Sequence, residues 1–238
     1  MKVLENINYA GIPDEARQLD VYIPEGPVKG SVIFFHGGGL DHGSRKAVAE
    51  YMGIVEAGYA FLSADYRLFP NVHYPAFLED AAQAVEFVHQ MAPQWGIPAE
   101  LFVSGASAGA WQIMMLAMDR TYLKDDSFVK GYISESAQVF AHYGILQDRG
   151  RDGRLEIIDE TAPIGYIREG LQLKPLVLLT YTDDVKCRPE ENRLMYASLI
   201  KLLPENHVDY GGLEGSHLHR VRNEDRVKAY LRFMDPLA

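Results

Sequence analysis

Residues 101–118 read LFVSGASAGAWQIMMLAM, and they carry the strongest local signal in the chain. Its first four residues are typical of a strand, and its last nine are typical of a helix. Between them, Gly105, Ser107 and Gly109 form a Gly-x-Ser-x-Gly pattern. In this context the pattern predicts a strained turn, the nucleophile elbow, in which the serine hydroxyl is exposed above a sheet. The alternative interpretation is a turn of small residues that serves only close packing.

Segments typical of strands and helices alternate along the rest of the chain, as in a mostly parallel α/β sheet. We therefore expect a single domain over residues 1–238. The segment 140–167 is polar and weakly periodic, which predicts an excursion outside the sheet, either a plain loop or a small lid. The predicted strands are 17–24, 30–37, 59–68, 100–107, 128–137, 174–184 and 207–215, and the predicted helices are 44–58 (with Ser44 as N-cap), 76–92, 108–120, 189–204 and 223–235.

The composition is that of a globular protein, with 47% hydrophobic and 24% charged residues in 238. A formal net charge of −10 argues against a nucleic acid or an anionic membrane as partner. The single cysteine, Cys187, excludes an intrachain disulfide and suits a reducing compartment. The N-terminal residues lack the pattern of a signal peptide, and no apolar run is long enough to span a membrane. We therefore expect a cytoplasmic protein, with a homo-oligomer left open.

A second glycine-rich stretch, His36-Gly37-Gly38-Gly39, follows the predicted strand 30–37. Its backbone amides can approach a substrate oxygen without side chains in the way, as in the oxyanion hole of an acyl-transfer site. The amide of Ala108, the residue after the candidate nucleophile, would complete such a site. A phosphate-binding loop is disfavoured, because neither of the common phosphate-loop patterns is present. We expect His36 to orient this loop rather than to act as a base.

A nucleophilic serine needs a base, and the base needs an orienting carboxylate. In proteins with an elbow of this kind, the expected order along the chain is serine, acid, histidine. We favour His217, in the loop after the last predicted strand, with His219 as the alternative. For the acid we favour Asp184, just beyond a buried strand, with Asp183 as the alternative. The histidines downstream of Ser107 are His142, His207, His217 and His219.

The stretches HGGG, DYRL, YPAFLEDAAQAVEFV, GASAG, TDD and GSH occur in an order that resembles a known family. They resemble the α/β-hydrolase esterases related to hormone-sensitive lipase and to acetyl-xylan and feruloyl esterase-like enzymes. The resemblance implies an α/β-hydrolase fold, and the roughly 35 residues before HGGG predict that it has no large N-terminal cap. It implies an ion pair between Asp65 and Arg67 that locks loops around the site. The residue roles it implies are nucleophile for Ser107, acid for Asp184, base for His217, and oxyanion donors for Gly37, Gly38 and Ala108.

The function implied is hydrolysis of small carboxylic esters through an acyl-enzyme on Ser107, with no metal or organic cofactor. A short-chain acyl group is expected, and an acetylated or aryl-esterified carbohydrate is one candidate substrate. The same triad would also suit an arylformamidase or a peptidase-like amide hydrolase. A non-catalytic ligand-binding relative is the third alternative. Phe69, Tyr74, Trp111 and Tyr143 are aromatic candidates for lining a pocket.

Overall fold

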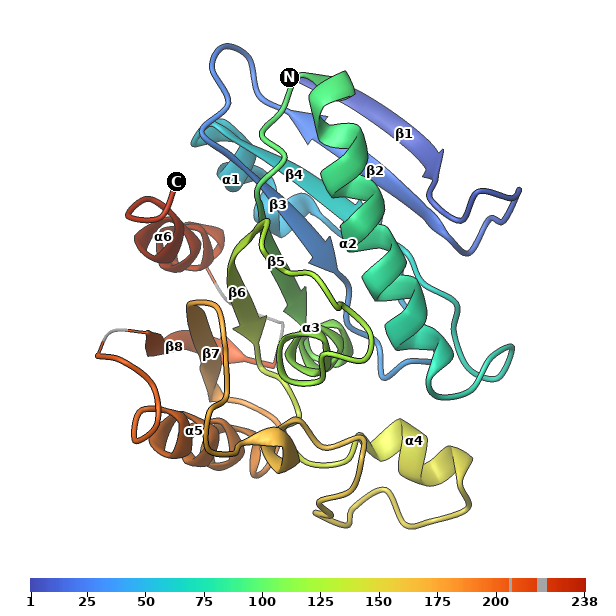
Figure 1. Ribbon diagram of the computed structural model, residues 1–238, viewed down its shortest axis with the longest axis vertical. Helices are drawn as coiled ribbons and strands as arrows, with labels where there is room; N and C mark the ends of the chain where they lie inside the picture. Colours follow the sequence, from blue (N-terminus) through green and yellow to red (C-terminus); the bar gives the residue numbers. More distant parts are fainter. Residues whose placement is uncertain (206, 218–221) are drawn as a thin grey trace.

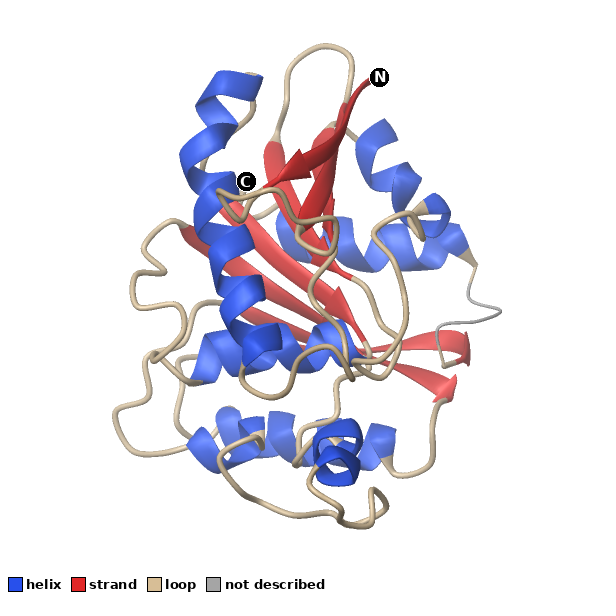
Figure 2. Ribbon diagram, turned by 90° about the vertical axis from the view of Figure 1, so that its right-hand side faces the viewer, coloured by secondary structure: helices blue, strands red, loops and turns tan. Residues whose placement is uncertain are grey.

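The computed structural model describes residues 1–205, 207–217 and 222–238. Within these ranges, eight strands form one sheet with helices on both sides (Figures 1 and 2). The order across the sheet is β1-β2-β4-β3-β5-β6-β7-β8. The strands are β1 (Lys2–Asn8), β2 (Gln18–Ile23), β3 (Gly30–Phe35), β4 (Tyr59–Ala64), β5 (Leu101–Ala106), β6 (Val129–Glu135), β7 (Leu176–Asp183) and β8 (Val208–Ser216).

The helices connect these strands and cover both faces of the sheet. The α-helices are α1 (Met52–Glu56), α2 (Ala76–Trp95), α3 (Ala108–Met118), α4 (Tyr143–Asp148), α5 (Arg188–Leu199) and α6 (Asn223–Met234), and the 3-10 helices are η1 (Ala49–Tyr51) and η2 (Pro163–Tyr166). In the described part of the chain, no helix is both long and apolar enough to cross a membrane.

All strand pairs from β4 to β8 are parallel, whereas β1 and β2 are antiparallel to their neighbours. Phe35 pairs with Gly105, and Ala106 pairs with Glu135, so β3, β5 and β6 end at nearly the same level. The carboxyl ends of parallel strands meet at one edge of a sheet, where α/β proteins commonly bind ligands. The predicted glycine loop, elbow and acid all follow such strand ends. This topology therefore gathers them at one edge.

Alternate side chains of the central strands supply two separate cores. On β3, Val32 and Phe34 join the cluster that contains side chains of α1 and α6. Ile33 and Phe35 point the other way, into the cluster that contains side chains of α2, α3 and α5. This alternation follows from the two-residue repeat of a strand, and burial on both faces explains why these strands are nearly continuous in apolar residues. The predicted mostly parallel α/β sheet is confirmed.

Two predictions about local structure were wrong. The helix predicted over 44–58 begins only at Ala49 as a 3-10 turn and continues as α1. Its first residues are held in turns because the Arg45 side chain enters a buried network with Asp20 and Asp65. The edge strand β1 was missed, because most of its residues are exposed and its sequence lacks a clear apolar alternation.

A buried ion pair joins the strand edge to α6. Arg226 Nε lies 2.7 Å from Glu135 Oε1, and both side chains are fully shielded from solvent. The Tyr51 hydroxyl donates to Glu135 at 2.9 Å, the Tyr230 hydroxyl does so at 3.2 Å, and Tyr181 donates to the same carboxylate. Because a buried charge is stable only when it is paired and hydrogen-bonded, these partners depend on one another.

Replacing Arg226 should therefore destabilise the folded protein. We expect Arg226→Met to lower the free energy of unfolding by about 3–5 kcal/mol, because it leaves Glu135 buried without its counter-charge. Urea denaturation measures the change, with Arg222→Met, an exposed arginine at the start of the same helix, as control. A loss no larger than that of the control would show that Arg226 does not stabilise Glu135.

Candidate active site

Ser107 occupies the sharp turn between β5 and α3. Its φ is +52°, a strained value for a residue with a side chain. Its amide donates to the carbonyl oxygen of Glu135 at 2.8 Å, and its own carbonyl accepts from the amide of Trp111 at 2.9 Å. Every residue of α3 is buried, whereas Ser107 is partly exposed. The fold thus holds the backbone of this turn and leaves the serine hydroxyl accessible.

Three side chains form a continuous hydrogen-bonded chain at this edge of the sheet. His217 Nε2 lies 3.0 Å from Ser107 Oγ, and His217 Nδ1 lies 2.6 Å from Asp184 Oδ1. Asp184 directly follows β7, and His217 directly follows β8. In this arrangement the imidazole can accept the hydroxyl proton while the carboxylate holds the ring in one orientation.

The Asp184 carboxylate is held in its ionised form. Burial of the group opposes ionisation, but the hydrogen bonds outweigh burial, and the pKa of Asp184 is lowered. These bonds come from His217, from the amides of Tyr181 and Val185, and from the Ser136 hydroxyl. A carboxylate that stays charged can stabilise an imidazolium ion when the histidine takes up a proton.

The side chain of the alternative acid, Asp183, does not join this hydrogen-bonded chain. Asp183 is exposed, and only its backbone carbonyl meets His217, whose amide donates to it at 3.3 Å. His219 lies outside the described residues. His207 bonds to the carbonyl of Leu173 and directly precedes β8, so it lies at the other end of this strand from His217. The two aspartates differ in exposure because adjacent residues at a strand end point in different directions.

Ser136, which the sequence analysis missed, contacts both the acid and the histidine. Its hydroxyl lies 2.9 Å from each carboxylate oxygen of Asp184 and 3.0 Å from His217 Nδ1. It directly follows β6, the strand between β5 and β7. Its position just beyond a strand end was the available signal, although a serine in that place is too common to be selected without the fold.

The glycine loop after β3 lies against the elbow. A Cβ on Gly109 would collide with the carbonyl oxygen of Phe35, so α3 can start this close to the end of β3 only with glycine. Gly38 has a φ of +116°, which side-chain-bearing residues rarely adopt, and a Cβ there would collide with the carbonyl of His42. The loop that carries Gly37 and Gly38 is thereby brought beside the first turn of α3.

His36 lies under this loop and is buried. Its Nδ1 lies 2.7 Å from the carbonyl oxygen of Gly37, and its Nε2 lies 3.4 Å from Asp65 Oδ1. The ring stacks on Tyr66, whose hydroxyl donates to the His36 carbonyl at 2.9 Å. These contacts fit an orienting group for the loop.

The expected ion pair between Asp65 and Arg67 does not form. Asp65 pairs with Arg45 instead, and Arg67 binds both carboxylate oxygens of the buried Asp80 of α2. Asp65 and Arg67 lie only two residues apart after β4, but Asp65 is directed toward Arg45 and Arg67 toward α2. Each still fastens the segment that follows β4, but to separate parts of the protein.

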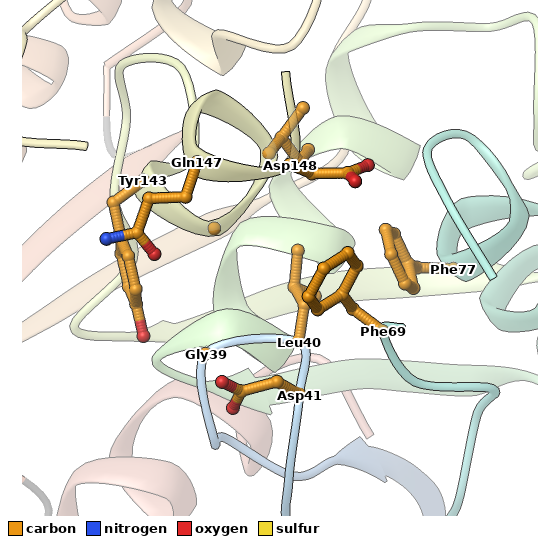
Figure 3. Close-up of a pocket in the computed structure, with 10 residues that line it drawn as sticks. Gly39, Leu40, Asp41, Phe69, Phe77, Tyr143, Gln147 and Asp148 are labelled. Carbon is orange, nitrogen blue, oxygen red and sulfur yellow. The ribbon is translucent and has the colours of Figure 1, made fainter. Parts of the chain in front are cut away.

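A cavity of about 180 Å³ lies beside the glycine loop (Figure 3). Tyr143 and Gln147 enter it from α4, and Phe69 and Phe77 face them from the opposite side. The Tyr143 hydroxyl packs so closely on Gly39 that a side chain at this position would collide with it. Of the four aromatic candidates, Phe69 and Tyr143 line this cavity. The lining residues are Gly39, Leu40, Asp41, Phe69, Phe77, Tyr143, Gly144, Ile145, Gln147 and Asp148.

The 140–167 excursion lies beyond the carboxyl ends of the strands and carries α4 (Figure 1). Trp111 of α3 is fully buried and donates to the carbonyl of Thr161 at 2.8 Å, so it anchors the excursion. His142 packs between Trp111 and Tyr143 and accepts a hydrogen bond from the amide of Gly144. Burial lowers the pKa of His142 to about 3, so this ring is neutral at physiological pH.

Glu191, in the first turn of α5, is a second buried carboxyl group near Asp184. Burial raises its pKa to about 7, against the opposing effects of Arg188 and of the Val139 amide; Glu156 and Asp184 raise it further. Elsewhere, across the part of the chain that the structure describes, no three histidine, cysteine or acidic side chains converge as a metal ion would require.

The family model BD-FAE matches residues 19–150, more than half of the chain. The chain belongs to the BD-FAE family. The residues matched to BD-FAE include the glycine loop and Ser107, and they end before Asp184 and His217. A human protein described as arylacetamide deacetylase-like 2 is 35% identical over 86 residues, which cover 33% of this chain and 21% of that protein. This BD-FAE chain spans only 21% to 27% of the length of the curated relatives that it matches.

Solved structures resemble this BD-FAE member over almost its whole length. A truncated carbohydrate esterase from gut microbiota has a TM-score of 0.79 at 16% identity, covering 100% of this chain and 95% of that one. An esterase 2 from Thermogutta terrifontis, phosphonylated by sarin, has a TM-score of 0.79 at 21% identity, covering 98% and 95%. The α/β-hydrolase fold implied by the sequence motifs is thus confirmed.

The raised pKa of Glu191 makes stability depend on pH. Between the ordinary carboxyl pKa of 4.5 and about 7, the folded protein holds a proton that the unfolded chain has released, so this group lowers stability as the pH rises. Glu191→Gln removes the effect. We expect the unfolding free energy of the variant, relative to wild type, to improve by about 2 kcal/mol from pH 5 to pH 8 in urea titrations. The exposed neighbour variant Glu190→Gln should show no such trend, and an equal trend in both would refute the assignment.

Proposed function

We propose that this protein is a serine esterase that cleaves small carboxylic esters through an acyl-enzyme on Ser107. The observation that carries the proposal is the hydrogen-bonded chain from Ser107 through His217 to Asp184, at the strand ends beside the glycine loop. Membership in the BD-FAE family and the likeness to carbohydrate and other esterases support the same reaction.

In the proposed reaction, His217 Nε2 removes the proton from Ser107 Oγ as the oxygen attacks the ester carbonyl carbon. The amides of Gly37, Gly38 and Ala108 stabilise the negative oxygen of the tetrahedral intermediate. The protonated His217 then gives its proton to the leaving alcohol, and an acyl-serine remains. Water, deprotonated by the same histidine, attacks the acyl-serine and releases the carboxylic acid.

We infer that the cavity beside the glycine loop binds a small acyl or aryl group of the substrate. Leu40, Phe69 and Phe77 give the cavity an apolar lining, and its volume of about 180 Å³ suits a small group. Tyr143 and Gln147 add polar groups at its other side. This mixture suits an acetylated or aryl-esterified carbohydrate. The exposed free thiol of Cys187 supports action in a reducing compartment such as the cytoplasm.

Replacing the nucleophile tests the reaction directly. With p-nitrophenyl esters from acetyl to decanoyl, we expect wild-type kcat/KM to be highest for the short chains and Ser107→Ala to lower it by about 10⁴-fold or more. Ser127→Ala serves as control, because Ser127 is exposed and lies before the amino end of β6, at the opposite edge of the sheet from Ser107. A fluorophosphonate should label wild type but not Ser107→Ala. Wild-type protein that neither hydrolyses an ester nor is labelled would refute the proposal, and preferential cleavage of N-formylkynurenine would make it an amidase.

Paired variants test the acid and the base. Asp184→Asn should lower kcat by about 10³–10⁴-fold, because the amide favours the wrong orientation and tautomer of the imidazole, whereas Asp183→Asn should stay within twofold of wild type. Likewise, His217→Ala should abolish activity, and His219→Ala should not. Steady-state kinetics on the preferred p-nitrophenyl ester measures all four. A larger loss from Asp183→Asn or His219→Ala would transfer the role to that residue.

A further inference from the structure

Three buried side chains in the first turn of α5 bind the backbone of segment 136–139. Arg188, Glu191 and Asn192 are between 0% and 6% exposed; we call them the α5 clamp. They bind consecutive parts of the segment that follows β6. The contacts are Arg188 Nη1 to the Ser136 carbonyl at 2.8 Å, Asn192 Nδ2 to the Ala137 carbonyl at 2.8 Å, and the Val139 amide to Glu191 Oε2 at 3.1 Å.

The first residue of this segment has a strained backbone. Ser136 is fully buried and has a φ of +59°, which is unfavourable for a residue with a side chain. Its amide donates to the Leu179 carbonyl at 2.7 Å, and its carbonyl is the group that Arg188 binds. In this conformation its hydroxyl reaches Asp184 and His217 together. A strained conformation persists only where its surroundings hold it, and here the Leu179 carbonyl binds the amide of Ser136 and Arg188 binds its carbonyl.

The α5 clamp is an unusual way to hold a loop. Among the described residues, no carboxylate lies within 4.0 Å of Arg188, and its buried Nε has no hydrogen-bond partner. Burial lowers the pKa of this guanidinium and raises that of Glu191. Buried charges without close counter-charges weaken a fold, so apolar packing would hold the segment at less cost in stability. The contacts of these residues with the backbone of segment 136–139 suit placement of that segment better than a gain in stability.

We propose that the α5 clamp is a positioning device that sets the Ser136 hydroxyl against the Asp184–His217 pair. The inference rests on the proposed esterase function. The Ser136 hydroxyl has one proton to donate. Its acceptor is Asp184, because both carboxylate oxygens lie 2.9 Å from Ser136 Oγ. Donation to the carboxylate leaves His217 Nδ1–H free to donate to Asp184 as well. Both bonds fix the ring so that Nε2 faces Ser107 without its proton.

The test compares two arginines of one helix. Arg188→Met removes the contact to the Ser136 carbonyl, and Arg193→Met removes an exposed charge one turn further along α5. Activity is expressed per active site titrated with a fluorophosphonate, so that misfolded protein does not count. We expect Arg188→Met to lower kcat by about 10- to 100-fold with KM changed less than threefold, as for loss of a hydrogen bond near a charged group. Arg188→Lys, which keeps a donor, should recover part of the loss.

A double-mutant cycle with Ser136→Ala shows whether the effect passes through Ser136. If it does, Arg188→Met costs at most about twofold in kcat once Ser136 has lost its hydroxyl. An undiminished loss in that background, or an unchanged kcat per titrated site in Arg188→Met, would overturn the proposal.

A measurement without turnover separates this inference from the esterase proposal. The His217 Nδ1 proton, hydrogen-bonded to Asp184, should give a downfield proton NMR signal that Asp184→Asn removes. We expect Arg188→Met to shift or broaden this signal and Arg193→Met to leave it unchanged. Absence of Ser107 labelling in wild type would count against the esterase function alone, whereas an unchanged signal in Arg188→Met would count against the clamp.

Discussion

The contact between Gly109 and the Phe35 carbonyl group sets the geometry of the whole strand edge. Because residue 109 has no side chain, the first turn of α3 can lie directly against the end of β3. That closeness brings Ser107 beside the glycine loop, which leaves β3 at the same level. Any larger residue would push the first turn of α3 away from the end of β3 and the glycine loop that follows it. The register of the parallel strands then places the segments after β6, β7 and β8 around the same point.

Glu135 links this edge to the rest of the fold. Its carbonyl accepts from the Ser107 amide, while its side chain binds Arg226 of α6 and Tyr181 of β7. Tyr181 in turn packs edge-on against the ring of His217, with centroids 6.1 Å apart. The backbone carbonyl of Glu135 therefore holds the turn at Ser107, while its carboxylate holds Tyr181 against the ring of His217. Such fully hydrogen-bonded polar groups in a core define one arrangement of their neighbours, because any other arrangement would leave a buried charge unpaired.

Helices and strands were predicted correctly where the apolar periodicity of the segment itself determines its structure. The apolar spacing of α2 and the buried runs of β5 and β7 were predictable because each segment carries its own periodicity. The failures have a shared cause. Residues 44–48 read as a helix, yet Arg45 binds Asp20 and Asp65, partners that lie outside its segment. Similarly, β1 is a strand because β2 pairs with it, and its own sequence supplies little of the signal.

The mostly parallel α/β sheet, the turn at Ser107 and the glycine loop could all be predicted from the sequence, because each is marked by patterns within runs of consecutive residues. The sequence also narrowed the candidate acid to two adjacent aspartates and the candidate base to two nearby histidines. The folded structure was needed to show that Asp184 rather than Asp183 meets His217, that Ser136 contacts both, and that Arg188 binds the Ser136 carbonyl. These contacts join residues 33 to 81 positions apart, and the direction of a side chain at a strand end is set by the strands beside it.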